Sequence, residues 1–315
     1  MTAGPTTQKL LLANPRGCCA GVDRAIAVVD QLLEEHGGPI YVRKEIVHNR
    51  EVVERLRAAG AVFVEEVNEV PEGEILVFSA HGISPEVRRQ AQERKLRAVD
   101  ATCPLVSKVH YEAIKFAGAG LHVLLIGHAE HDEVIGTMGE IPGQISLVES
   151  VQDVEHVQVP DEERVAVITQ TTLSVDETRD IMDAVKRRFP RVRTPARDDI
   201  CYATQNRQDA VRDLAPRCDV LLVVGSENSS NSLRLRELAQ QIGTPAYLID
   251  NAEQIDPAWI DGVERIGITA GASSPEYLVQ TIVARLREMG RFDITEYGEP
   301  EPEIIFAMPR EISLI

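Results

Sequence analysis

Short runs of β-branched and leucine residues alternate along the chain with longer stretches in which apolar residues recur every three or four positions. The short runs predict strands and the longer stretches predict amphipathic helices. The clearest predicted strands are Ile75–Phe78, His122–Ile126, Val165–Thr169, Val220–Val224 and Arg265–Thr269. The clearest predicted helices are Val22–His36, Asn49–Ala59, Pro85–Lys95, Val175–Arg188 and Asn206–Leu214. Strand, polar loop and helix in regular succession indicate an α/β protein with largely parallel sheets.

Three cysteines, Cys19, Cys103 and Cys201, each lie just after a short predicted strand and just before a predicted helix, roughly a third of the chain apart. No two of them are close enough in sequence to form a local metal knuckle, so they meet only if the fold brings them together. Three converging thiolates suit an iron–sulfur cubane with one iron not ligated by protein, because a cubane normally takes four cysteines. An open iron can bind a substrate oxygen, which favours a catalytic role.

The alternative for each cysteine is a buried small hydrophobic residue. Cys218 stands at the entry of a predicted strand, where a packing role is expected. Cys18 is adjacent to Cys19, and adjacent side chains seldom point to one site. We therefore expect Cys18 to line the wall of the cavity rather than to serve as the ligand.

Each third of the chain supplies one of the three thiols and two further polar loops at strand ends. Ligands of parallel sheets lie beyond the carboxyl ends of strands, so three similar domains around a pseudo-threefold axis would gather these loops in one cavity. The repeat is one of architecture, with little sequence identity between the thirds. The predicted architecture is α/β, with three small domains over residues 1–97, 98–195 and 196–285 and a tail over 286–315. Ile304–Phe306 in that tail is a candidate closing strand.

The polar loops carry histidine, hydroxyl and amide side chains: His48, His81, His131, Thr171, Ser229, Ser230, Asn231 and Ser273. Hydroxyl and amide groups at helix N-termini can bind an anion, although single residues of this kind can also be helix caps. Loop histidines can contact phosphate or relay protons, and a solvated histidine or a metal ligand remains the alternative. A helix starting near Leu233 is expected after the serine-rich loop.

Glu133 follows two histidines in the stretch G-H-A-E-H-D-E. A surface glutamate is the ordinary expectation for such a position. Beside an anion and a cluster, negative neighbours and desolvation would both favour its protonated form. Glu133 is therefore the candidate general acid.

The chain of 315 residues carries 50 acidic and 33 basic residues, a net charge of −17. Such an acidic chain binds nucleic acid or anionic lipid poorly without a specific site. No apolar run predicts a signal peptide or a membrane span, so a cytoplasmic protein is expected. In that reducing compartment the five cysteines are expected to be thiols or metal ligands.

Nine stretches in order resemble the 4-hydroxy-3-methylbut-2-enyl diphosphate reductase family of the non-mevalonate isoprenoid pathway. They are A-N-P-R-G-x-C-A-G-V-D-R-A-I, I-V-H-N, F-S-A-H-G, D-A-T-C-P-L-V-x-K-V-H, I-G-H-x-x-H-x-E-V-x-G-T-M-G, T-Q-T-T-L-S-V-D, D-D-I-C-Y-A-T-x-N-R-Q, V-G-S-x-N-S-S-N-S and T-A-G-A-S-x-P. They run from Asn14 to about Arg287, which is nearly the whole chain.

The resemblance implies a three-lobed α/β trefoil around a 4Fe-4S cluster with one iron not ligated by protein. By the same resemblance Cys19, Cys103 and Cys201 are the ligands, and His131, Glu133 and Thr171 serve the hydroxyl end of the substrate and its proton relay. The diphosphate would be held by His48, His81, Ser229, Ser230, Asn231 and Ser273. Two electrons from a donor such as ferredoxin or flavodoxin, with two protons, would remove the allylic hydroxyl as water and give isopentenyl or dimethylallyl diphosphate.

Two other functions stay open at this stage. One is a lyase or dehydratase of the quinolinate synthase type, in which an open iron acts as a Lewis acid without net electron input. The other is a nonenzymatic sensor of iron or oxygen, which the predicted anion-binding loop at Ser229–Asn231 disfavours. A requirement for an external reductant separates the reductase from the lyase.

Overall fold

The computed structural model describes residues 7–309, which form two compact units. Unit 1 comprises residues 7–20, 48–55 and 202–305, and unit 2 comprises residues 21–47, 56–201 and 306–309. Helices α1 (Ala20–His36) and α2 (Arg50–Ala58) begin in unit 1 and continue into unit 2. No helix among the described residues combines the length and the apolar character that crossing a membrane requires.

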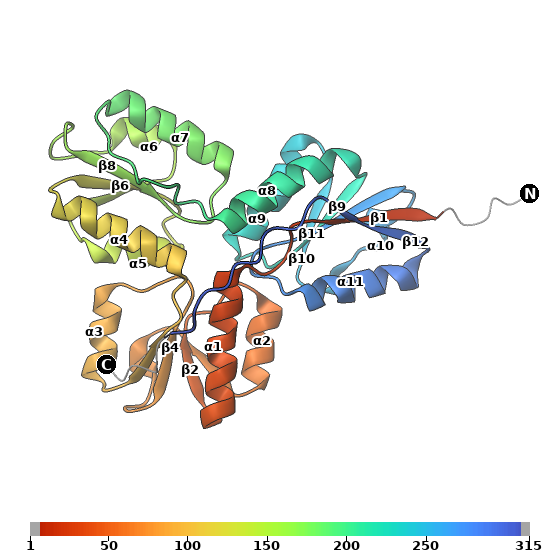
Figure 1. The fold of residues 1–315 in the computed structure, drawn as a ribbon, viewed down its shortest axis with the longest axis horizontal. Coiled ribbons are helices and arrows are strands. Elements are labelled where there is room, and N and C mark those ends of the chain that lie inside the picture. Colours follow the sequence, from red (N-terminus) through yellow and green to blue (C-terminus); the bar gives the residue numbers. More distant parts are fainter. Residues whose placement is uncertain (1–6, 310–315) are drawn as a thin grey trace, which may run out of the picture. The chain divides into compact units, whose positions relative to one another are not determined.

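Unit 1 is built on one five-stranded parallel sheet with the order β10-β9-β11-β1-β12 (Figure 1). Its strands are β1 (Gln8–Ala13), β9 (Val220–Val224), β10 (Ala246–Ile249), β11 (Arg265–Ala270) and β12 (Phe292–Tyr297). Its remaining helical segments are α8 (Tyr202–Leu214), η2 (Ala215–Arg217), α9 (Ser230–Ile242), η3 (Ala252–Gln254), α10 (Pro257–Ile260) and α11 (Glu276–Met289).

Both faces of the unit 1 sheet are buried, because side chains of successive strand residues point to opposite faces. Leu222 and Val224 of β9 pack with α11 on one face. Leu221 and Val223 of the same strand pack with α8 and α9 on the other. All five residues of β9 are buried, as expected of a central parallel strand.

Unit 2 contains two smaller parallel sheets. The first has the order β3-β2-β4-β5 and the second β7-β6-β8. The first sheet and its helices comprise β2 (Ile40–Arg43), β3 (Ala61–Val64), η1 (Val67–Glu69), β4 (Ile75–Phe78), α3 (Pro85–Glu93) and β5 (Arg97–Asp100). The second comprises α4 (Pro104–Gly118), β6 (His122–Ile126), α5 (Asp132–Glu140), β7 (Ile145–Val148), α6 (Val151–His156), β8 (Val165–Thr169) and α7 (Val175–Arg188). In the second sheet α4 and α5 pack on one face, and α6 and α7 pack on the other.

The predicted α/β class is confirmed, and every strand pair of the three named sheets is parallel. Four of the five predicted strands have the predicted bounds, and the fifth runs one residue further, to Ala270. The caps predicted from sequence are present, since the Ser84 and Ser174 hydroxyls accept from backbone N–H groups in the first turns of α3 and α7.

Three local predictions are wrong. No strand immediately precedes Cys201, because the chain between α7 and α8 makes only an isolated bridge at Arg193. The helix expected near Leu233 begins at Ser230 with Ser229 as its cap. Ile304–Phe306 is not a strand, because the place beside β1 at the edge of the sheet is taken by β12.

The sheets also cross the predicted domain boundaries. β1 lies in the first predicted domain but pairs with β11 of the third predicted domain and with β12 of the predicted tail. β5 begins at the boundary residue Arg97 and pairs with β4, and β12 lies inside the predicted tail. Hydrophobic pattern alone predicts that these segments are strands, but it does not say which sheet they join. The division into three domains stays a prediction.

Candidate active site

Cys19, Cys103 and Cys201 occupy equivalent backbone positions. Each stands immediately before a helix, at α1, α4 and α8 respectively. Their backbone N–H groups donate to the carbonyls of Ala272, Ala80 and Thr171, at 3.1, 3.0 and 3.1 Å. Each of these carbonyls belongs to the second residue beyond a parallel strand, namely β11, β4 and β8. All three side chains are half-buried, and a helix N-terminus favours an anionic group such as a thiolate.

The other two cysteines differ from these three. Cys218 packs in the core of unit 1, as predicted, and burial raises the pKa of its thiol to about 12. In the adjacent pair, the position equivalent to Cys103 and Cys201 is taken by Cys19 rather than by Cys18.

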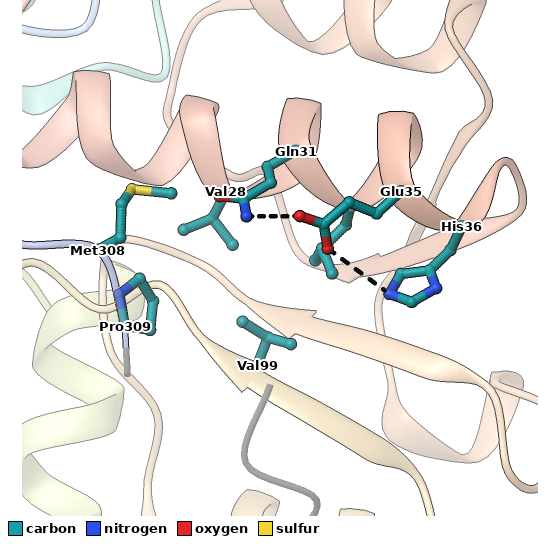
Figure 2. A pocket seen from close by; sticks show the side chains of 8 residues that line it. Val28, Gln31, Glu35, His36, Val99, Met308 and Pro309 are labelled. Carbon is teal, nitrogen blue, oxygen red and sulfur yellow. Dashed lines mark hydrogen bonds and ion pairs between the residues drawn. The ribbon is translucent and has the colours of Figure 1, made fainter. Parts of the chain in front are cut away.

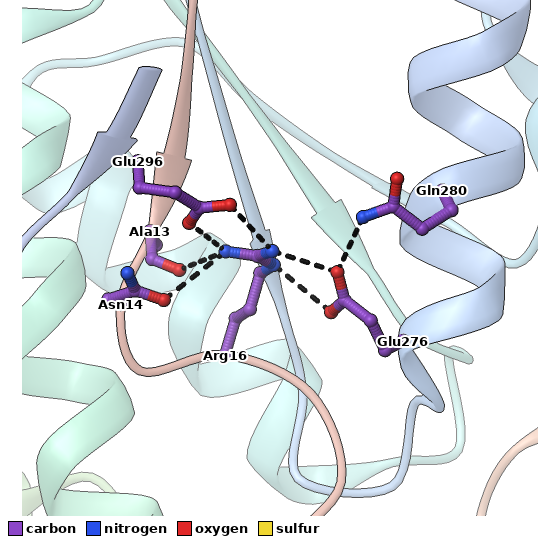
Figure 3. A network of polar contacts seen from close by, with 6 residues as sticks. All are labelled: Ala13, Asn14, Arg16, Glu276, Gln280 and Glu296. Atoms are coloured by element: carbon purple, nitrogen blue, oxygen red, sulfur yellow. Dashed lines mark hydrogen bonds and ion pairs between the residues drawn. The ribbon is translucent and has the colours of Figure 1, made fainter. Parts of the chain in front are cut away.

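The loop that carries Cys19 is anchored at its start by Arg16. The guanidinium group of Arg16 donates to both carboxylate oxygens of Glu276 on α11 and of Glu296 on β12, at 2.6 to 3.1 Å (Figure 3). A further bond of 3.0 Å reaches the carbonyl of Ala13 at the end of β1. These contacts tie the loop to three neighbouring elements of unit 1.

Unit 1 brings together His48, the serine-rich turn at the end of β9 and the loop at the end of β11. The Ser273 hydroxyl donates to the His48 carbonyl at 2.9 Å and lies 3.3 Å from the Ser229 hydroxyl. Asn49, which the sequence did not single out, joins the set, because its amide donates to the Ser274 hydroxyl at 3.2 Å. The serine and asparagine side chains of this set are uncharged.

Two glycines make this close approach possible. A Cβ on Gly225 would lie 2.2 Å from the Ser232 hydroxyl oxygen, and one on Gly271 would lie 2.1 Å from the same atom. Asn231 packs at the same place, and its side-chain oxygen, turned to face Ala272, accepts from that N–H at 2.7 Å. Ser229 caps α9 by accepting from Ser232 N–H. The capping role is therefore confirmed for Ser229, and anion binding by this turn stays a prediction.

In unit 2, the predicted histidines His81 and His131 are neighbours. Their rings meet edge to face, with centroids 5.8 Å apart. His81 lies beside Ala80, whose carbonyl accepts the Cys103 N–H. His131 caps α5, where its Nδ1 accepts from Glu133 N–H at 3.2 Å.

Glu133 is buried, with only 2% of its surface exposed. It is therefore not the surface glutamate that is the ordinary expectation. Its two carboxylate oxygens accept from the Thr171 N–H at 2.7 Å and the Thr171 hydroxyl at 2.8 Å. Desolvation raises the pKa of Glu133 to about 7, helped by the nearby charge of Asp199 and opposed by the two Thr171 hydrogen bonds. The Thr171 carbonyl in turn accepts the Cys201 N–H, so an acid that can titrate near neutral pH is linked through one residue to a cysteine.

His110 lies on α4, the helix that follows Cys103. It is buried, and its Nδ1 pairs with Glu140 at 2.8 Å. A Cβ on Gly82 would lie 3.0 Å from its Nε2. This histidine therefore packs behind the loop that follows His81.

A cavity of about 550 Å³ lies beside α1 in unit 2 (Figure 2). Its walls include Val28 and Leu32 of α1, Val99 of β5 and Met308. None of the predicted site residues lines this cavity, so it plays no part in the candidate chemistry.

The fold and these loops define a parallel α/β protein with three cysteines at equivalent backbone positions, a cluster of serine and asparagine side chains and a buried acid. A family model described as LytB protein matches residues 10–287. The chain is 56% identical to 4-hydroxy-3-methylbut-2-enyl diphosphate reductase 2 of Burkholderia mallei, over 97% of this chain and 94% of that protein. It is 57% identical to the reductase of the same name from Stenotrophomonas maltophilia, over 97% of this chain and 98% of that protein.

A solved structure, that of the E-1-hydroxy-2-methyl-but-2-enyl-4-diphosphate reductase from Plasmodium falciparum, superposes with a TM-score of 0.92. It is 40% identical to this chain, and the match covers 96% of both chains. The chain belongs to the 4-hydroxy-3-methylbut-2-enyl diphosphate reductase family. Members of this family are iron–sulfur oxidoreductases, and the recognition made from the nine sequence stretches is confirmed.

Proposed function

We propose that this chain reduces (E)-4-hydroxy-3-methylbut-2-enyl diphosphate to isopentenyl and dimethylallyl diphosphate. Two electrons and two protons replace the allylic hydroxyl by hydrogen and release it as water, so atoms and charge balance. The observation that carries the proposal is the equivalent backbone position of Cys19, Cys103 and Cys201. The N–H group of each cysteine donates to the carbonyl of the second residue beyond a parallel strand. Three such thiols in a member of this family fit a shared metal cluster.

The three cysteines would hold a 4Fe-4S cluster with one iron not ligated by protein. When bound, the cluster would supply the two electrons one at a time, received from a carrier protein such as ferredoxin or flavodoxin. The cysteines themselves would not react, because their role would be to hold the cluster.

The diphosphate would be bound by His48, His81, Ser229, Ser230, Asn231 and Ser273. In unit 1 the serine and asparagine members of this set carry no charge; the Ser229 and Ser273 hydroxyls lie 3.3 Å apart, and Asn231 accepts from the N–H of Ala272, the neighbour of Ser273. Uncharged donors suit an anionic substrate in a chain whose net charge is −17, because they stabilise phosphate oxygens without adding negative charge.

Glu133 would deliver a proton at the hydroxyl end of the substrate, with His131 and Thr171 fixing its position. The buried carboxyl group has a raised pKa and therefore holds a proton to near neutral pH. Thr171 contacts both of its oxygens, and His131 accepts from its backbone N–H.

The test is turnover of the allylic diphosphate by anaerobically reconstituted protein, with and without an artificial one-electron reductant. The reductase predicts both products only when the reductant is present. Conversion at the same rate without the reductant would support the lyase alternative, and no conversion under either condition would overturn the proposal. Inorganic diphosphate should compete with the substrate, which a sensor with no substrate site does not predict.

A further inference from the structure

Each helix that begins beside one of the three cysteines carries a cationic residue in its second turn. Arg24 is the fifth residue after Cys19, Lys108 the fifth after Cys103 and Arg207 the sixth after Cys201. None of these cations was among the residues that the sequence singled out. Each cation donates hydrogen bonds to the loop that carries a different one of the three cysteines.

Arg24 on α1 donates from Nη1 to the carbonyls of Ala101 and Thr102, at 3.2 and 3.1 Å. These are the two residues immediately before Cys103. Its Nε donates to the Ala307 carbonyl at 2.8 Å. The helix that follows Cys19 thus holds the loop of Cys103.

Lys108 on α4 holds the loop of Cys201 in the same way. Its Nζ donates to the carbonyls of Arg197 and Asp198 at 2.7 and 3.1 Å, and it pairs with the Asp199 carboxylate at 2.6 Å. Asp199 is buried, and its second oxygen accepts the Thr169 N–H at the end of β8. The cation therefore also fixes the strand end that leads to Thr171.

Arg207 on α8 closes the series by holding the loop of Cys19. Its side chain is fully buried, and it donates twice to the Gly17 carbonyl, at 2.8 and 2.6 Å, and once to the Cys18 carbonyl at 3.2 Å. A 3.0 Å ion pair with Glu301 completes its surroundings. The three contacts thus form a cycle. The helix after Cys19 holds the loop of Cys103, the helix after Cys103 holds the loop of Cys201, and the helix after Cys201 holds the loop of Cys19.

We propose that Arg24, Lys108 and Arg207 are positioning residues that fix the three cysteine loops. The same three cations set the reduction potential of the metal cluster that the cysteines hold. This inference rests on the proposed ligand set. Cations near a cluster favour its reduced form, which carries more negative charge, and hydrogen bonds beyond the ligands hold those ligands in place. A guanidinium or ammonium group that bridges two consecutive carbonyls also limits how far the loop can open to release iron.

The test compares Arg24→Met, Lys108→Met and Arg207→Met with the charge-conserving variants Arg24→Lys, Lys108→Arg and Arg207→Lys. Arg94→Met is the matched control, because Arg94 is a half-buried cation that donates to a backbone carbonyl, that of Val70 at 2.6 Å, in a segment without a cysteine. Three properties are measured without substrate after anaerobic reconstitution: iron per chain, cluster midpoint potential and the rate of iron release to a chelator.

Each Met variant should bind iron as the unaltered chain does, have a more negative midpoint potential, and release iron at least tenfold faster. The charge-conserving variants should keep the potential, and Arg94→Met should match the unaltered chain in all three properties. Unchanged potential and release rate in all three Met variants, or equal shifts in Arg94→Met, would overturn the proposal. Because Arg207 is fully buried, Arg207→Met could fail to fold. In that case the result for Lys108→Met, at a half-buried residue, tests the proposal. Failure of the proposed ligand set would look different, because the unaltered chain would then bind no cluster. Failure of the proposed reductase activity alone would leave the cluster and these three measurements in place.

Discussion

The polar loops of unit 1 and of unit 2 are built from different chemistry. Those of unit 1 carry serine and asparagine groups held by hydrogen bonds to one another, around His48 and Ser273. Those of unit 2 carry two histidines in ring contact and a buried carboxyl group, Glu133. The first set suits binding of an anion without transfer of charge, and the second suits transfer of a proton.

Under the proposed roles, this difference allows an acidic chain to bind an acidic substrate. A carboxylate among the unit 1 serines would repel a diphosphate, whereas a protonated carboxyl in unit 2 would not. Burial keeps Glu133 protonated toward neutral pH. Binding and proton delivery should therefore respond separately to mutation, oxidation and pH.

Oxygen should produce the largest effect. An iron not ligated by protein is the labile corner of a cubane, so aeration should remove that iron and abolish turnover. The unit 1 serines and asparagine do not depend on the cluster, so binding of inorganic diphosphate, measured by calorimetry, should persist after aeration. Turnover that survives prolonged aeration at unchanged iron content would contradict the cluster model.

Glu133→Gln should lower turnover by about 10²–10⁴-fold, the usual contribution of general acid catalysis. The amide keeps the size of the side chain and its contact with Thr171 but has no acid proton to give. Substrate should still bind and perturb the visible spectrum of the cluster, which separates this variant from one that has lost its cluster. A change in rate below about threefold would assign the acid role elsewhere.

Asn231→Ala and Ser273→Ala should weaken substrate affinity by roughly 10–100-fold, because a hydrogen bond to a charged group contributes about 1.5–3 kcal/mol. Iron content and the pH profile should be unchanged in both variants. Asn228→Ala, in an exposed residue of the same turn, is the matched control and should bind substrate normally. A loss of iron in Ser273→Ala would contradict the assignment of the unit 1 polar groups to substrate binding alone.

The pH dependence should be the smallest effect. Burial raises the pKa of Glu133 from 4.5 to about 7, so the active protonated form is lost as pH rises. Between pH 6.5 and 7.5 the protonated fraction falls about threefold, and single-turnover rates should follow it in the native chain but not in Glu133→Gln. Because the folded pKa lies above the ordinary value, this group stabilises the fold fully below pH 4.5 and progressively less up to pH 7. A flat rate profile across this range would contradict the assignment.

Local structure was largely predictable from the sequence, because continuous apolar runs such as Val220–Val224 and helices with N-cap serines are determined by neighbouring residues. Sheet membership was not, since the pairing of β1 with β11 and β12 joins the two ends of the chain. The edge strand β12 alternates half-buried and exposed residues, so its pattern is weak, and the more apolar Ile304–Phe306 was the better sequence candidate.

The sequence predicted where the three cysteines stand, each just before a helix, and singled out Glu133, which the structure buries; the roles of all four stay predictions. The cations Arg24, Lys108 and Arg207 were missed because each acts on a loop far away in sequence. A signal was nevertheless present, namely a cation five or six residues after each cysteine, and it becomes visible only when the three helices are aligned on their cysteines. Asn49 was missed for the same reason, because it neighbours Ser274 only through the fold of unit 1.

The central claim is that Cys19, Cys103 and Cys201 together hold one cluster. The most direct measurement is iron and sulfide per chain, with the visible spectrum, after anaerobic reconstitution of single Cys→Ser variants at all five cysteine positions. Cys19→Ser, Cys103→Ser and Cys201→Ser should each lose the cluster absorbance, whereas Cys18→Ser and Cys218→Ser should retain it. Retention of a full cluster in Cys19→Ser together with its loss in Cys18→Ser would contradict the equivalence of the three backbone positions on which the account depends.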